Sequence, residues 1–285
     1  MLGFLNIDKP SGMTSNAVVQ KVKKKFKIKK IGHFGTLDPM ASGVLPLAIG
    51  KATRLFDYSL EKKKAYIVVF EFGYLTDTLD STGTILEEGG SIPTLEDINS
   101  VIPSMLGKQD QIPPMYSAKN VNGRRAYDLA REGIEFELKP KEITIYKLEL
   151  LEQVSETKFR FNVVCSSGTY IRAIGRDLGS KLGTIATMTE LRRTIAGDFD
   201  LTNIVKLDDC LSLESIDSVL LNPIKVFSAL GTIEITNDIY AKLKNGIKVE
   251  YSPITKDSFV VCENRLVGIA KKNDNILKLD TYLDD

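Results

Sequence analysis

The 285-residue chain is long enough to bury a substantial core, and its composition, 43% apolar and 26% charged, is ordinary for a globular protein. The length predicts one large domain or two unequal ones. A single histidine and three cysteines without CxxC spacing argue against a disulfide framework, a thiolate metal cage and most zinc chemistry. A catalyst in this chain must rely on carboxylates, tyrosines and cations.

Apolar segments long enough to span a bilayer are missing from the sequence, and the first residues do not read as a secretory leader. We therefore expect a soluble, cytoplasmic protein with no membrane contact. The cysteines, unpaired in the sequence pattern, agree with a reducing compartment.

Positive charge is concentrated in the first 64 residues, which hold 13 Lys or Arg against 4 Asp or Glu, although the net charge of the whole chain is only +1. A turn at residues 10–12 precedes Thr14 or Ser15, either of which can cap a helix. Along this helix Val18, Val22 and Phe26 form an apolar stripe. The other positions are rich in lysine: Lys21, Lys23, Lys24, Lys25, Lys27, Lys29 and Lys30. Such a face is as typical of a solvated surface as of a phosphate-binding one.

Hydrophobic patterns predict further elements. Strands are expected at residues 3–8, 65–73, 142–152 and 158–165, with the last two forming an antiparallel hairpin. A helix follows with an apolar stripe at Ile171, Ile174, Leu178 and Leu182; Thr169 would cap it and Gly183 would end it.

The glycines and prolines in residues 31–54 predict mostly shaped loop there. Residues 109–134 carry the cations Lys119, Arg124, Arg125 and Arg131, with a turn at Asn122 and a short helix at 127–131. They are interpreted as a mobile basic flap or as a simple crossover connection. Residues 200–230 are acidic and weakly helical, and short strands alternating with turns are expected after Gly231.

Asp38 stands in a glycine-bracketed loop directly before Pro39, which favours an extended, rigid backbone. By itself an Asp-Pro pair in a loop is more often a turn device than a catalytic group. The spacing of Gly43 and Gly50 does not match a phosphate loop, and the serines before Gly168 do not form a nucleophile elbow. A nucleoside triphosphatase and a serine hydrolase are therefore disfavoured.

The segment GHFGTLDPMASGVLPLAIGKATR, residues 32–54, resembles the signature of the TruB family of tRNA pseudouridine-55 synthases. Further matches in the family's order span most of residues 1–200: FLNIDKPSGMTS, TDTLDSTG, QIPPMYSAKNVNGRRAYDLAREG, SSGTYIRAIGRDLG and MTELRRTIAGDF. The resemblance implies an α+β catalytic domain over residues 1–230, with a largely antiparallel central sheet, flanking helices, a catalytic cleft and the 109–134 flap. Residues 231–285 resemble a short PUA-like RNA-binding β domain.

The resemblance also implies roles for particular residues. Asp38 matches the essential carboxylate and Arg172 its cationic partner, which would pair with its charge and hold its orientation. Tyr66 matches the tyrosine that stacks on the extruded base and is a candidate for handling the C5 proton. Residues matching the substrate pocket are Tyr170, Leu191 and, stacking within the RNA loop, His33, which fits base flipping. Without the resemblance each of these residue types is more often structural.

The implied reaction isomerises uridine 55 in the T-loop of tRNA: an N-glycosidic bond is cut, the uracil turns, and a C-glycosidic bond forms. One carboxylate can drive this without a metal or an organic cofactor, by attacking the sugar, by stabilising its positive charge or by attacking the uracil ring. The expected partner is the T-arm of tRNA, bound by a monomer that needs no protein partner. Alternatives are an RNA-binding or tRNA-folding protein, and a synthase that acts on another RNA in a guided complex.

Overall fold

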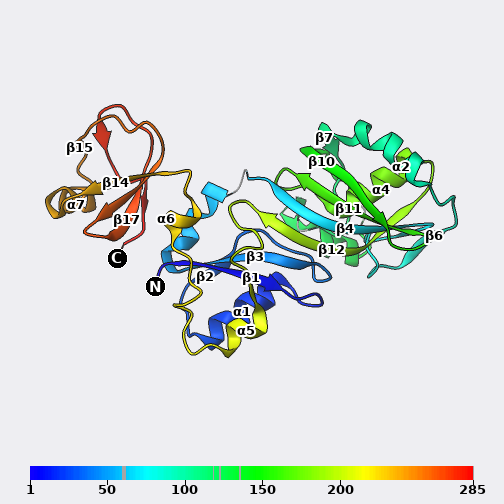
Figure 1. The fold of residues 1–285 in the computed structure, drawn as a ribbon, viewed down its shortest axis with the longest axis horizontal. Coiled ribbons are helices and arrows are strands. Elements are labelled where there is room, and N and C mark those ends of the chain that lie inside the picture. The colour runs from blue at the N-terminus through cyan, green and yellow to red at the C-terminus, as the bar shows by residue number, and fades with distance from the viewer. Residues whose placement is uncertain (60–61, 118, 122, 135, 285) are drawn as a thin grey trace.

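The computed structural model describes the whole chain apart from residues 60–61, 118, 122, 135 and 285. Its centre is a nine-stranded sheet in the order β13-β1-β3-β12-β4-β11-β10-β7, with β2 paired to β3 (Figure 1). These strands are β1 (Gly3–Lys9), β2 (Ile31–His33), β3 (Ser42–Ile49), β4 (Lys64–Phe72), β7 (Gly107–Gln111), β10 (Lys141–Gln153), β11 (Lys158–Cys165), β12 (Ala186–Ala196) and β13 (Val205–Lys206).

Most neighbouring strands in this sheet run antiparallel, and the parallel pairs are β1 with β13 and β3 with β12. The α+β fold with a largely antiparallel central sheet, predicted from the sequence, is therefore confirmed. The expected hairpin is also present, because β10 and β11 pair antiparallel.

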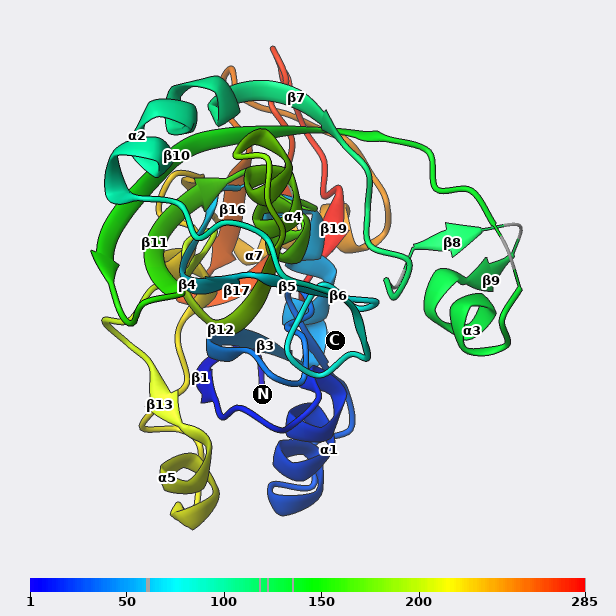
Figure 2. The same cartoon turned by 90° about the vertical axis from the view of Figure 1, so that its right-hand side faces the viewer.

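The helices lie in separate parts of the molecule. They are α1 (Ser15–Lys25), α2 (Leu95–Val101), α3 (Ala126–Arg131), α4 (Ile171–Lys181), α5 (Leu207–Ser212), α6 (Pro223–Val226) and α7 (Asn237–Lys244), with 3-10 turns η1 (Gly50–Ser59) and η2 (Ile102–Met105). Helices α1 and α5 lie side by side next to β1, whereas α4 packs against β12 and β4 (Figure 2). Among the described residues, the helices are too short or too polar to cross a membrane.

The C-terminal part forms a second sheet, separate from the first (Figure 1). It contains β14 (Gly231–Ile235), β16 (Ser258–Cys262), β17 (Arg265–Ala270) and β19 (Thr281–Tyr282), while β15 (Val249–Glu250) pairs with β18 (Ile276–Leu277). Two further two-stranded ladders pair β5 (Tyr74–Thr76) with β6 (Ile85–Glu88), and β8 (Asn120–Val121) with β9 (Arg124–Arg125). Helix α7 was not expected; Thr236 caps it by accepting a hydrogen bond from the amide of Ile239.

Aromatic packing joins the N-terminal strand to the C-terminal sheet. The Phe4 ring lies 5.3 Å from that of Phe34 and 5.5 Å from that of Phe227, both edge-on. Phe259 and Ile269 of the second sheet belong to the same buried cluster. Burial of each such side chain contributes about 1.5–3 kcal/mol, so this shared cluster anchors the second sheet on the part of the first that contains β1.

The expectation of mostly loop over residues 31–54 is wrong, because Ser42–Ile49 form strand β3 in the middle of the sheet. Residues 43–49 are all buried, and a continuous apolar run is the pattern of a strand covered on both faces. Pro46 sits opposite Asn6, and its carbonyl still accepts a hydrogen bond from Phe34. Only residues 34–41 remain as the loop that carries Asp38.

The sequence predicted N-cap residues for α1 and α4, and the structure agrees for α1 but not for α4. Thr14 is the N-cap of α1 and accepts a hydrogen bond from the amide of Ala17. The expected cap of α4 is wrong: Tyr170 holds the N-cap position, and the Thr169 hydroxyl instead donates to the carbonyl of Ser166, 2.9 Å away. Gly183, at φ +67°, follows the end of α4 as expected.

The flap interval begins inside the sheet, because its first residues, 109–111, belong to β7. The ladder of β8 and β9 and helix α3 then project away from the sheet (Figure 2). Asn122 and the side chains of Arg125 and Arg131 lie outside what the structure describes.

Candidate active site

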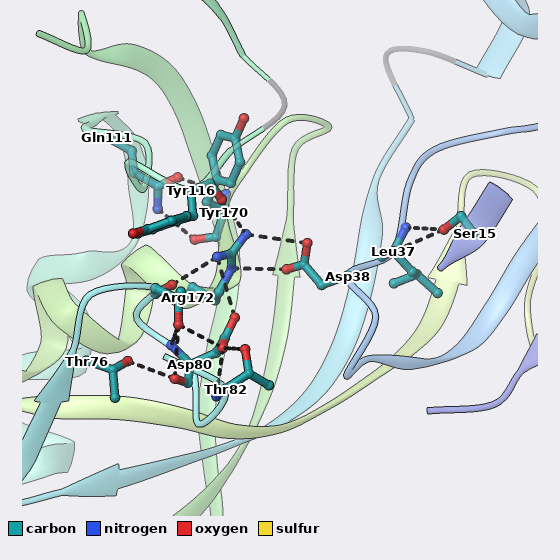
Figure 3. A network of polar contacts seen from close by, with 11 residues as sticks. Ser15, Leu37, Asp38, Thr76, Asp80, Thr82, Gln111, Tyr116, Tyr170 and Arg172 are labelled. Carbon is teal, nitrogen blue, oxygen red and sulfur yellow. Dashed lines mark hydrogen bonds and ion pairs between the residues drawn. The ribbon is translucent and has the colours of Figure 1, made fainter. Parts of the chain in front are cut away.

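Asp38 and Arg172 form an ion pair between the loop after β2 and the first turn of α4 (Figure 3). Nε of Arg172 lies 3.0 Å from Oδ2 of Asp38, and Nη2 lies 3.4 Å from Oδ1. This fork arrangement fixes the carboxylate plane as well as its position. The Asp38 side chain is 35% exposed and that of Arg172 only 8%, so the pair leaves one side of the carboxylate open.

The Arg172 guanidinium is held by other groups as well. Nη1 donates to the carbonyl of Thr78 at 2.9 Å, and Nη2 donates to that of Tyr116 at 3.2 Å. Asp80 Oδ2 lies 3.5 Å from Nη1. Figure 3 shows Arg172 between Asp38 and Asp80. Because two carboxylates and two backbone carbonyls hold it, the guanidinium is preorganised before substrate arrives.

Buried groups fix the backbone on both sides of Asp38. The Ser15 hydroxyl donates to the carbonyl of Leu37 and accepts from its amide, at 3.0 and 2.8 Å. The Lys9 ammonium donates to the carbonyl of Pro39 at 3.2 Å. Burial lowers the pKa of Lys9 to about 8, while the nearby Asp38 charge opposes that change. Strand β1 and helix α1 therefore position the catalytic loop.

Arg193 closes the base of this loop. Its fully buried side chain donates to the carbonyls of Gly35, Thr36 and Val44, at 3.1, 3.3 and 2.8 Å. Burial lowers the pKa of Arg193. One guanidinium thus ties the start of the loop to β3 beyond its end.

Tyr66 on β4 lies beside Arg193, its partner across the β4–β12 ladder, and shares a side-chain hydrogen bond with it. Burial raises the pKa of the Tyr66 hydroxyl to about 12; the Arg193 charge opposes this and the Asp38 charge adds to it. The hydroxyl is therefore neutral at physiological pH. The structure brings Tyr66, Asp38 and Arg193 into one electrostatic neighbourhood.

The remaining predicted site residues come from three different parts of the fold. Tyr170 directly precedes α4 and is held by Gln111, which accepts from its amide at 2.9 Å and donates to its carbonyl at 3.1 Å. Leu191 is buried on β12, two residues before Arg193. His33 lies on β2, and the charge that acts on it is that of Arg193. Burial, and then the Arg193 charge, lower the pKa of His33, which keeps the ring neutral.

Sequence reasoning missed Asp80, Arg193, Lys9 and Ser15 as parts of the site. The segment containing Asp80, TDTLDSTG, was quoted as part of the family resemblance, with no role given to Asp80. Its density of Asp and Thr is the signal that could have identified a fixed turn, since these side chains bond to nearby backbone. Indeed Asp80 accepts from the amide of Thr82 at 3.0 Å and from the hydroxyl of Thr78 at 2.9 Å. In the described part of the chain, no group of three or more His, Cys, Asp or Glu could hold a metal ion.

Family models cover this site. The model of the TruB family pseudouridylate synthase N-terminal domain matches residues 23–171, and that of the tRNA pseudouridylate synthase B C-terminal domain matches residues 172–223. Asp38 lies in the first match, and Arg172 begins the second.

Curated relatives and solved structures agree with these matches. The chain is 44% identical to the tRNA pseudouridine synthase B of Clostridium perfringens, over 99% of both proteins, and 40% identical to that of Clostridium kluyveri, over 98% of both. A chain from the crystal structure of a Cbf5-Nop10-Gar1 complex is similar with a TM-score of 0.72 and 26% identity, over 98% of this chain and 83% of that one. The sequence, the fold and the geometry around Asp38 lead to one conclusion: this chain belongs to the TruB family of pseudouridylate synthases and is an isomerase.

Proposed function

We propose that this enzyme converts uridine 55 in the T-loop of tRNA to pseudouridine, with Asp38 as its catalytic carboxylate. The observation that carries the proposal is the ion pair itself: a partly open carboxylate fixed by a buried guanidinium that two backbone carbonyls also hold. Relatives named tRNA pseudouridine synthase B support tRNA as the substrate. The position within tRNA rests on the resemblance of residues 32–54 to the family signature.

The reaction is balanced within one nucleotide. The N1–C1′ bond breaks, the uracil turns, the C5–C1′ bond forms, C5 loses a proton and N1 gains one. Asp38 would act on the side not occupied by Arg172, by attacking C1′, by stabilising positive charge on the sugar, or by attacking the ring. In each case the Arg172 guanidinium already holds the Asp38 carboxylate in place and does not have to reorient during the reaction. Such preorganisation of charged groups is usually the largest contribution to rate enhancement.

We assign the walls of the base pocket to Tyr66, Tyr170 and Leu191, with the uridine flipped out of the RNA loop and His33 stacking where it leaves. A neutral Tyr66 hydroxyl suits stacking and hydrogen-bond donation. Direct removal of the C5 proton by Tyr66 would require its phenolate, which only the adjacent Arg193 could stabilise.

The enzyme would recognise RNA by its shape and through contacts to its phosphates. The lysine-rich face of α1 and the 109–134 flap would make these contacts. Residues 1–230 would form the catalytic domain and residues 231–285 a PUA-like RNA-binding domain. Because Asp38, Arg172 and Tyr66 all come from one chain, we propose that a monomer is active without a protein partner. We place its action in the cytoplasm, where mature tRNA is used.

The proposal is tested with a tRNA transcript carrying 5-tritiated uridine. Formation of pseudouridine releases tritium from C5, and chemical mapping locates the new residue. We expect stoichiometric release under single-turnover conditions and none when residue 55 is changed to cytidine. A protein that only binds or folds tRNA would release no tritium, and modification elsewhere would contradict the assignment to uridine 55. Mapping of bulk tRNA from cells lacking the gene would show loss at the same position.

A further inference from the structure

Three consecutive lysines precede Ala65, and the first two have partners. Lys62 forms an ion pair with Asp198, and the Lys63 ammonium lies over the Tyr146 ring, 4.4 Å from its centroid. The third, Lys64, is partly buried at the start of β4, between Cys165 on β11 and Ala196 on β12. Among the residues that the structure describes, no hydrogen-bond or ion-pair partner is found for its ammonium.

The Lys64 ammonium lies close to the catalytic loop, beside Gly35. A Cβ on Gly35 would be 3.2 Å from Nζ of Lys64 and 3.6 Å from Nη1 of Arg193. Gly35 has a φ of +91°, which also favours glycine. The Lys64 ammonium is thereby held against the loop that presents Asp38.

Lys141, at the start of β10, lies against a glycine in the turn before α4, the helix that carries Arg172. Its ammonium occupies the space that a Cβ on Gly168 would need, and Gly168 lies in the turn before α4. Lys141 is exposed, and within the described part of the chain it also has no acidic partner. Two lysines therefore lie over two glycines, one beside Asp38 and one beside Arg172.

The charges in this cluster repel one another. Burial, then Arg193 and also Lys141 lower the pKa of Lys64 to about 8. Cys165 supplies no negative charge at neutral pH, because burial raises the pKa of its thiol to about 11. Desolvated cations are normally paired, and an unpaired one lowers the stability of the folded protein. A local conflict of this kind, beside a reactive group, indicates a site completed by a ligand.

The position of the cluster identifies the ligand class. Lys64 and Tyr66 are alternate residues of β4, so their side chains leave the same face of the sheet about 7 Å apart. A uracil stacked on Tyr66 stays attached to its sugar, so the RNA backbone on either side of that sugar must pass close to Tyr66. The anion that arrives there with the base is a phosphodiester.

We propose that Lys64 and Lys141 form a binding site for one backbone phosphate of the RNA segment that carries the target uridine. That the ligand is RNA rests on the proposed function. It contributes affinity at the catalytic cleft, separately from contacts made by α1 or the flap.

The test uses K64Q and K141Q, with K158Q as the matched control. Lys158 lies at the other end of β11 from Cys165 and pairs with Glu71 at 3.5 Å. The probe is a T-arm hairpin whose phosphates are replaced, one at a time, by neutral methylphosphonates. Dissociation constants are measured for each RNA with each variant, after thermal melts have shown that the variants are folded.

We expect K64Q and K141Q each to bind the unmodified hairpin about tenfold or more weakly, as for loss of a charge-assisted hydrogen bond, and K158Q to bind like wild type. The salt dependence, as the slope of log affinity against log salt, should decrease by about 0.7–0.9. At one position the methylphosphonate should weaken binding by wild type at least as much as K64Q does. The same replacement should cost less affinity in K64Q than in wild type, because only the Lys141 contact is left to lose.

Equal binding by wild type, K64Q and K141Q would overturn the site, and so would additive losses from K64Q and every methylphosphonate. Tritium release from the unmodified tRNA by wild type is measured in parallel. If that release fails, the proposed function fails; if it succeeds while K64Q binds like wild type, only the phosphate site is wrong.

Discussion

Asp80 holds the far side of the Arg172 guanidinium, with Oδ2 3.5 Å from Nη1, while Asp38 binds the near edge. The Asp80 side chain is only 7% exposed, which leaves little of its surface for contact with the substrate. Its effect on catalysis must therefore pass through the orientation of Arg172. A carboxylate that acts through another residue should change the chemical step more than binding.

Replacement of Asp80 by asparagine should separate these two quantities. D80N keeps the side-chain shape but removes the charge that holds Arg172, so kcat should fall about tenfold to hundredfold, the usual effect of small misplacement. The dissociation constant for tRNA should stay within about twofold. Asp77, on the same turn, accepts from the amide of Thr84 at 2.8 Å, and D77N is the matched control. An equal loss in both variants would mean that only the turn was disturbed.

Arg193 should matter mainly for folding of the catalytic loop. R193K keeps the charge but cannot serve three carbonyls with a fork of donors, and each buried acceptor left unpaired costs about 1–3 kcal/mol. We expect urea denaturation to show a loss of about 3 kcal/mol or more. Arg192, its neighbour, makes a bidentate ion pair with Asp8 and is 40% exposed, so R192K leaves its one partner open to solvent and should cost clearly less than R193K. Similar losses in the two variants would contradict this role.

The hydroxyl of Tyr66 should ionise only in strong alkali. In the folded protein it keeps its proton to about pH 12, whereas in the unfolded chain it loses it near pH 10. Stability is therefore lost as pH rises from about 10 to 12, and Y66F should lose less over that window. The difference in phenolate absorbance between wild type and Y66F, followed during titration, reports this group alone. A midpoint near pH 10 would show that Tyr66 is not buried as described.

RNA affinity should depend on pH through Lys64. The charged groups facing it are Arg193 on β12 and Lys141 on β10, with the neutral thiol of Cys165 on β11. In the free protein the ammonium loses its proton above about pH 8, and a bound phosphate would restore it. Affinity should be constant below pH 8 and fall by up to about tenfold per pH unit above it. Lys9 titrates in the same range, so the predicted result is that K64Q removes most of this fall. The same pH dependence in K64Q would contradict it.

Local patterns in the sequence were sufficient for much of the fold. The β10–β11 hairpin, helix α1 and the strand after the lysines follow from period-2 and period-3.6 spacing. Strand β3 was missed because Gly43 and Pro46 were interpreted as loop signals, although the apolar run around them is buried by neighbours from distant parts of the chain. Helix α7 was missed because its eight residues make only about two turns, too few for a clear period-3.6 pattern.

Some residues of the site could likewise be identified from the sequence, and others could not. Resemblance to the family signature pointed to Asp38 and Arg172, 134 positions apart, and the fold brings them into contact. Asp80, Arg193 and Lys9 could not be selected from the sequence, because they act through backbone carbonyls or through another side chain. Such contacts depend on the tertiary fold and leave no spacing pattern.

The central claim is that the Asp38 carboxylate performs the chemistry, and the most direct measurement is single-turnover tritium release from tRNA by D38N at saturating enzyme. Asparagine preserves shape and removes the negative charge. Release should be abolished while tRNA binds with an affinity close to that of wild type. Turnover by D38N at a rate near that of wild type would contradict the account.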